Sequence, residues 1–173
     1  MHTLHLLRHA KSSWKDDVDD HRRGLSRRGR EAARRVGEHL PAAVGPLDLV
    51  LASSALRTRQ TLDLILARFA PRPRILIEDE LYLATADRLL ERLRRLAEED
   101  RNVLLIGHNP GLRELALALA DTAAPASLPL ASGKFPTAVR VSFHIATPWP
   151  ALGRSRLAPA DYVTVDSLPG GKD

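Results

Sequence analysis

The chain has 173 residues, of which 44% are hydrophobic and 27% charged, so it is long enough for a globular domain with a buried core. It contains no cysteine, which excludes disulfide bridges, a thiolate nucleophile and zinc sites built on cysteine. The formal net charge of +5 favours anionic partners, but only 4% of the residues are aromatic, which argues against nucleic-acid binding by base stacking.

Most of the chain alternates short apolar runs with helical patterns. The runs have the length and flanking turn residues of buried strands, and they cover residues 4–7, 47–51, 74–77 and 102–106. The helical patterns follow them at about residues 27–39, 54–69, 85–96 and 112–120. Ser26 is a suitable N-cap for the first helix, and Pro41 is expected to end it. This alternation predicts an α/β fold, a three-layer α/β/α sandwich with a mainly parallel central sheet.

The last third of the chain is less regular. Residues 121–134 predict a loop, and residues 139–145 alternate apolar and polar side chains, as in a half-exposed strand that is at an edge or antiparallel. A last short extended piece is expected at 162–165. We expect one domain over residues 1–173, frayed from about residue 169. We also expect a cytoplasmic protein, because no signal peptide and no membrane-length apolar run is present.

Three of the predicted strands end in residues that suit phosphate chemistry. The first ends in Arg8 and His9, the second leads through 53–54 to Arg57, and the fourth is followed by His108. The carboxyl ends of parallel strands meet at one edge of a sheet, where ligands bind in open α/β folds. The arginine fork suits phosphate oxygens, and a neutral imidazole is a nucleophile near pH 7. The pattern therefore predicts phosphoryl transfer onto His9.

The same residues lie in runs that resemble the histidine phosphatase superfamily, which has the phosphoglycerate mutase-like fold. The matching runs are residues 7–10, 53–61 and 107–110. Residues 8–14 and 25–29 are similar to the SixA-type phosphohistidine phosphatase branch. Phosphoglycerate mutases differ, because they are longer and have glycine where this chain has Ala10.

The resemblance implies a role for each of these residues. His9 is the expected nucleophile, while Arg8 and Arg57 hold the phosphoryl oxygens. His108 is expected to be protonated and to donate a hydrogen bond to the phosphoryl group. Ser12 is a candidate for a further phosphate contact. No metal or cofactor is required, since the arginines supply the positive charge.

Glu80 follows the third strand, at the place where many members of the family carry an acidic proton donor. An alkoxide leaving group needs such a proton, whereas an imidazole leaving group needs it less. Glu80 is therefore a candidate general acid and, alternatively, an ordinary solvated carboxylate.

These observations predict a phosphatase that works through a covalent phosphohistidine intermediate. The expected substrate is phosphohistidine on a protein, because the short chain leaves few residues to build a lid over the site. The alternatives are a small-molecule phosphomonoesterase and a non-catalytic module that binds phosphate or a phosphoprotein. Phosphate or sulfate is expected in the site, with neither nucleic acid nor membrane as a partner. The substrate, the oligomeric state and any movement of residues 11–24 stay open.

Overall fold

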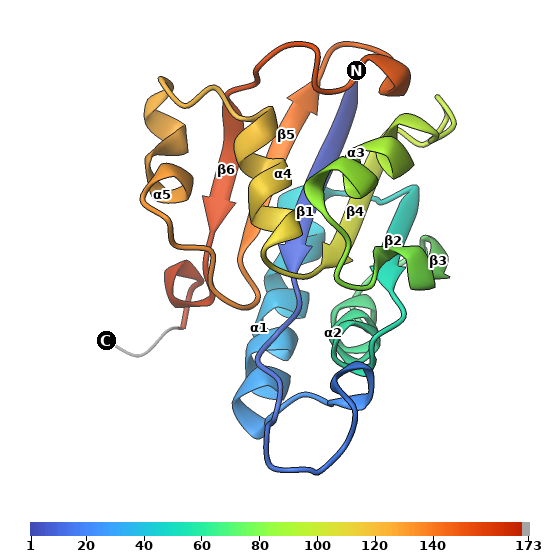
Figure 1. Cartoon of the computed structure of the whole chain (residues 1–173), viewed down its shortest axis with the longest axis vertical. Coiled ribbons are helices and arrows are strands. Elements are labelled where there is room, and N and C mark those ends of the chain that lie inside the picture. Colours follow the sequence, from blue (N-terminus) through green and yellow to red (C-terminus); the bar gives the residue numbers. More distant parts are fainter. Residues whose placement is uncertain (171–173) are drawn as a thin grey trace.

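The computed structural model describes residues 1–170 and places a six-stranded sheet between two layers of helices (Figure 1). The strand order is β3-β2-β4-β1-β5-β6, so β1 and β4 lie at the centre. Strands β1 to β4 run parallel to one another, and β5 is antiparallel to both β1 and β6. The strands are β1 (His2–Arg8), β2 (Leu49–Ser53), β3 (Arg74–Glu78), β4 (Asn102–Gly107), β5 (Arg140–Ile145) and β6 (Pro159–Val163). The predicted α/β/α architecture is confirmed.

The helices cover the sheet because its strands are apolar on both faces. On one face, α1 (Arg27–Val44) and α2 (Leu56–Leu66) pack over alternate residues of β1, β2 and β4. On the other face, α3 (Ala86–Arg94) and α4 (Gly111–Leu119) pack over the intervening residues of the same strands. The short α5 (Leu128–Ala131) lies beside α4 (Figure 1). In residues 1–170 no helix combines the length and apolarity needed to cross a bilayer.

Some boundaries differ from those predicted. Helix α1 continues through Pro41 to Val44 and ends where the Gly45 N–H donates to the Pro41 carbonyl. Strand β5 is antiparallel as expected, but it is neither half-exposed nor at an edge, because it lies between β1 and β6. The predicted 121–134 loop contains α5. Of the expected frayed tail, residues 169–170 form a turn and 171–173 lie outside the described residues.

The start of α1 fixes the backbone that follows β1. Ser26 caps the helix by accepting a hydrogen bond from the Gly29 N–H at 3.0 Å, and its own N–H donates to the Lys11 carbonyl at 2.9 Å. A Cβ atom on Gly29 would lie 1.9 Å from that same carbonyl oxygen. Only glycine therefore allows the helix to approach this close. The contact holds Lys11 in place, two residues after His9.

Candidate active site

The structure brings Arg8, His9, Arg57 and His108 together at the carboxyl ends of three adjacent strands. Arg8 is the last residue of β1 and pairs in register with Gly107, the last residue of β4. His9 and His108 directly follow these two strands, and their ring centroids are 5.3 Å apart. Arg57 lies in the first turn of α2, just beyond the end of β2, where the helix N-terminus adds a positive dipole end. The sheet order therefore explains how residues distant in sequence share one site.

His9 is held as a neutral imidazole with a defined tautomer. Its Nδ1 lies 2.7 Å from the Ala10 carbonyl oxygen, which can only accept, so the ring hydrogen is on Nδ1 and the Nε2 lone pair is free. Burial lowers the pKa of His9 from 6.5 to about 4, and the charges of Arg57 and Arg8 act in the same direction. The side chain is thus a neutral imidazole at pH 7, with an unprotonated Nε2.

His108 is also neutral in these surroundings when no anion lies beside it, and its expected protonation toward a bound phosphoryl group stays a prediction. Burial lowers its pKa to about 3, with further lowering by His9 and Arg57. Its Nε2 lies 2.7 Å from the Ser53 hydroxyl oxygen, which accepts from the Ala55 N–H at 3.2 Å and has its own proton to donate. When the hydroxyl donates this proton to Nε2, the imidazole hydrogen is on Nδ1, a buried atom with no hydrogen-bond partner among the described residues.

The two arginines differ in how their donors are used. Arg8 donates from Nη1 to the Phe135 carbonyl at 2.8 Å, while its buried Nε has no partner in residues 1–170. Arg57 gives both terminal nitrogens to Asp20: Nη1 to the backbone carbonyl at 2.7 Å and Nη2 to the carboxylate at 3.0 Å. Leaving a buried donor unpaired costs about 1–3 kcal/mol. An oxyanion is a group that would satisfy such a free donor of Arg8.

Asp20 is the centre of a contact network that the sequence analysis missed. Its carboxylate accepts hydrogen bonds from Arg57, from Arg23 Nη1 at 2.9 Å and from the Tyr82 hydroxyl at 2.5 Å. The Tyr82 ring also packs edge-on against His108, with centroids 5.5 Å apart. These residues come from the loop after β1 and the loop after β3. No periodicity or spacing marks them, whereas Ser53 could have been found from its place at the end of β2.

Two other predicted site residues have different partners. The Glu80 side chain is 54% exposed and forms ion pairs with Arg95 at 3.3 Å and Arg92 at 3.5 Å, both outside the four-residue group. The Ser12 hydroxyl accepts a hydrogen bond from Arg23. The structure therefore places Ser12 in contact with the Asp20 network, and Glu80 beside α3.

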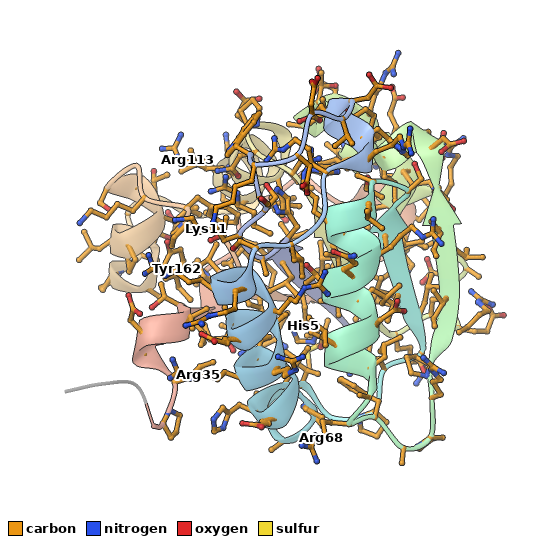
Figure 2. All side chains as sticks on the ribbon, turned by 90° about the horizontal axis from the view of Figure 1, so that it is seen from below. His5, Lys11, Arg35, Arg68, Arg113 and Tyr162 are labelled. Carbon is orange, nitrogen blue, oxygen red and sulfur yellow. The ribbon has the colours of Figure 1, made fainter. Side chains whose placement is uncertain are left out.

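Aromatic and histidine side chains complete the surroundings of the site. His21 packs edge-on against Tyr82 with centroids 4.8 Å apart, and its Nε2 lies 2.9 Å from the Ser54 hydroxyl. Trp14 is 79% exposed, and the Arg23 guanidinium lies 3.2 Å from the centroid of its ring. His5, seen behind α1 and α2 in Figure 2, is a buried histidine with partners on both ring nitrogens and no part in this group.

Comparison with known proteins agrees with this geometry. The model of the histidine phosphatase superfamily, branch 1, matches residues 4–82. An uncharacterised protein of Mycobacterium tuberculosis is 34% identical over 149 residues, which are 83% of this chain and 89% of the relative. The chain belongs to the histidine phosphatase superfamily, in its SixA-type branch.

Solved structures support the assignment to this branch. A protein named as a "putative phosphohistidine phosphatase SixA" from Nakamurella multipartitia is 26% identical, with a TM-score of 0.82, over 94% of this chain and 95% of the other. A second protein so named, from Agrobacterium tumefaciens, is 27% identical, with a TM-score of 0.78, over 94% of this chain and 97% of the other. The predicted family is therefore confirmed.

Proposed function

We propose that the protein is a metal-independent phosphatase in which His9 carries the phosphoryl group as a covalent intermediate. The observation that carries the proposal is the hydrogen bond from His9 Nδ1 to the Ala10 carbonyl. It leaves Nε2 free for attack, and it stabilises the positive charge that the ring acquires when Nε2 binds phosphorus. Neutral His9 beside two guanidiniums is the state that nucleophilic attack on a phosphoryl group requires.

The reaction proceeds in two displacements. In the first, His9 Nε2 attacks phosphorus, a P–N bond forms, and the bond to the leaving atom breaks with its electron pair on that atom. In the second, water attacks phosphorus and the P–N bond breaks, which returns the electron pair to His9 and releases phosphate. The Nε of Arg8 and, in the tautomer with hydrogen on Nδ1, His108 are the proposed donors to the oxyanion charge that grows in each step, because both atoms lack another partner among the described residues. Arg57 supplies a further cation once its fork is free.

We propose phosphohistidine on a protein as the substrate. Its leaving group is an imidazole nitrogen, and a ring protonated on its other nitrogen takes the departing electron pair and leaves as neutral imidazole, with no acid needed at the scissile atom. The exposed ring of Trp14, held by Arg23 beside the Asp20 network, is the kind of aromatic surface that contacts a protein partner.

A small-molecule phosphomonoesterase is the second candidate, and it requires a proton donor for the alkoxide. Glu80 has that role in the sequence-based hypothesis.

The test is acid-quench trapping with a phosphorylated histidine protein as donor. We expect acid-labile, base-stable label on the wild-type chain and none on His9→Ala, and label that persists in the variant would refute the nucleophile. Turnover in excess EDTA should equal that without it, and a strict requirement for a metal would refute the metal-independent mechanism. A panel of phosphate monoesters run beside the phosphohistidine protein then decides between the two substrates. Binding of phosphate without turnover of any donor would favour the non-catalytic module.

A further inference from the structure

We propose that Asp20 is an internal competitor of phosphate: its carboxylate holds Arg57, and a substrate phosphoryl group must displace it. This inference rests on the proposed phosphatase function and identifies a residue that sets the selectivity of the site. The fork of a guanidinium binds a phosphoryl group through two parallel N–H donors. In Arg57 both terminal nitrogens already donate to Asp20, one to its backbone carbonyl and the other to its carboxylate.

The carboxylate of Asp20 is charged and well held. Its pKa lies below the ordinary value, chiefly because the Tyr82 hydroxyl donates to it, and the hydrogen bond and charge of Arg57 add to that effect. Arg23 makes an ion pair with the other carboxylate oxygen at 2.9 Å. Asp20 therefore presents two acceptor oxygens to Arg57, the Oδ2 of its carboxylate and its backbone carbonyl oxygen, where a phosphoryl group would present two of its own. The two anions cannot use the same donors at once.

The position of Asp20 in the chain allows the exchange. It is the first residue of the one-turn helix η1 (Asp20–Arg22), and the preceding residues 14–19 are exposed. Its own side chain is 41% exposed, so it can turn to solvent without opening the core. Arg57, by contrast, is 4% exposed and fixed in α2. Rotation of this side chain thus frees Nη2 of Arg57 for a phosphoryl oxygen, while the buried cation stays in place with Nη1 on the Asp20 backbone carbonyl.

The competition has a consequence for selectivity. Free phosphate can replace Asp20 at Arg57 only through its own oxygens. Its apparent affinity for the protein is therefore lower than its affinity for molecules in which Arg57 is free, because Asp20 occupies Arg57 in the others. A phosphoprotein gains additional contact area outside the phosphoryl group, which offsets that cost. After hydrolysis, the return of Asp20 to Arg57 promotes release of the product. The site therefore discriminates against dissolved phosphate.

The test is titration calorimetry of inorganic phosphate on the full chain, with Asp20→Asn as the variant. Asparagine keeps the shape of the side chain and removes its charge. Asp19→Asn is the matched control, because Asp19 is exposed and its side chain makes no cap hydrogen bond. We expect the dissociation constant of phosphate to fall about tenfold in Asp20→Asn, the scale of one charge-assisted hydrogen bond in a part-exposed pair. In Asp19→Asn it should change less than about twofold.

A second variant covers the case in which Asp20→Asn does not fold. Tyr82→Phe keeps the ring against His108 and removes one donor that holds Asp20, and we expect about threefold tighter phosphate binding. Unchanged or weaker binding in the folded variant, with normal binding by the wild type, would overturn the inference and show that Asp20 positions Arg57 instead. That result would leave the proposed phosphatase intact. If neither wild type nor Asp20→Asn binds phosphate, or if Arg57→Ala binds it as well as wild type, the anion site itself fails and the proposed function with it.

Discussion

The neutral state of His9 predicts how the stability of the fold responds to acid. The pKa of His9 is lowered from 6.5 to about 4 in the fold, chiefly by burial. Between these two values the unfolded chain binds a proton that the folded chain does not, so acidification favours unfolding. The contribution of neutral His9 to stability is complete above pH 6.5 and is lost as the pH falls through about 4.

The magnitude follows from the same two values. Between pH 7.5 and pH 5.0, a histidine with this shift loses about 2 kcal/mol of unfolding free energy. His5 and His108 are also buried, with pKa values lowered to about 4 and about 3, so the three together lose about 6 kcal/mol. His9→Asn removes one of these groups, and the loss in the variant should be about 4 kcal/mol.

The assay is urea unfolding of both proteins at pH 7.5 and pH 5.0, followed by circular dichroism. We expect the wild-type midpoint to fall further than that of His9→Asn, with similar m-values. His5→Asn is a matched control, since it removes an equivalent buried histidine outside the site and should show the same reduced loss. An identical acid loss in wild type and His9→Asn would mean that His9 titrates as in the unfolded chain, and the argument for a neutral nucleophile would be refuted.

Four further substitutions test separate parts of the structure. Ser53→Ala removes the hydroxyl that sets the His108 tautomer, so kcat should fall about tenfold with little change in KM, and nitrogen NMR of the imidazole should show a mixed tautomer. Arg57→Lys keeps the charge but loses the fork, and we expect kcat/KM to fall about a hundredfold; Arg59→Lys, an exposed neighbour, should stay within about twofold. Gly29→Ala brings a methyl group onto the Lys11 carbonyl and should cost about 1–3 kcal/mol in urea unfolding. Glu80→Gln should change turnover of phosphohistidine and of esters by less than about twofold, because the carboxylate is exposed and paired with α3; a loss confined to esters would instead support the general-acid role.

The sequence was sufficient to predict the parts of the molecule that depend on regular patterns. The apolar runs located the strands, and the rule that parallel strands end at one edge predicted that Arg8, His9, Arg57 and His108 would meet. The positions of the strands follow from local periodicity, and the meeting of the four side chains follows from the topology of the sheet. Both can be derived from the order of residues along the chain. The family followed from the same short runs.

Other features depend on three-dimensional surroundings and could not be predicted. The alternation in β5 indicated a half-exposed strand, but β5 lies between β1 and β6, and its Arg140 and Ser142 are buried. The charge state of His108 is set by burial and by the neighbouring His9 and Arg57, none of which a motif records. Asp20 is one of several acidic residues in a polar loop, and only the folded backbone distinguishes it from Asp19.

The central position of β1 has a consequence for how the site behaves during partial unfolding. Backbone ladders to β4 and β5 flank β1 on both sides, and His9 follows it directly. The backbone amides of β1 should therefore exchange with deuterium only when the whole sheet opens. Their exchange rates should be among the slowest in this molecule. Residues 14–19 are exposed and lie outside the sheet, so their amides should exchange within seconds. We therefore expect His9 and the segment that leads to Asp20 to open in separate cooperative units, so that the segment can detach repeatedly while His9 keeps its geometry.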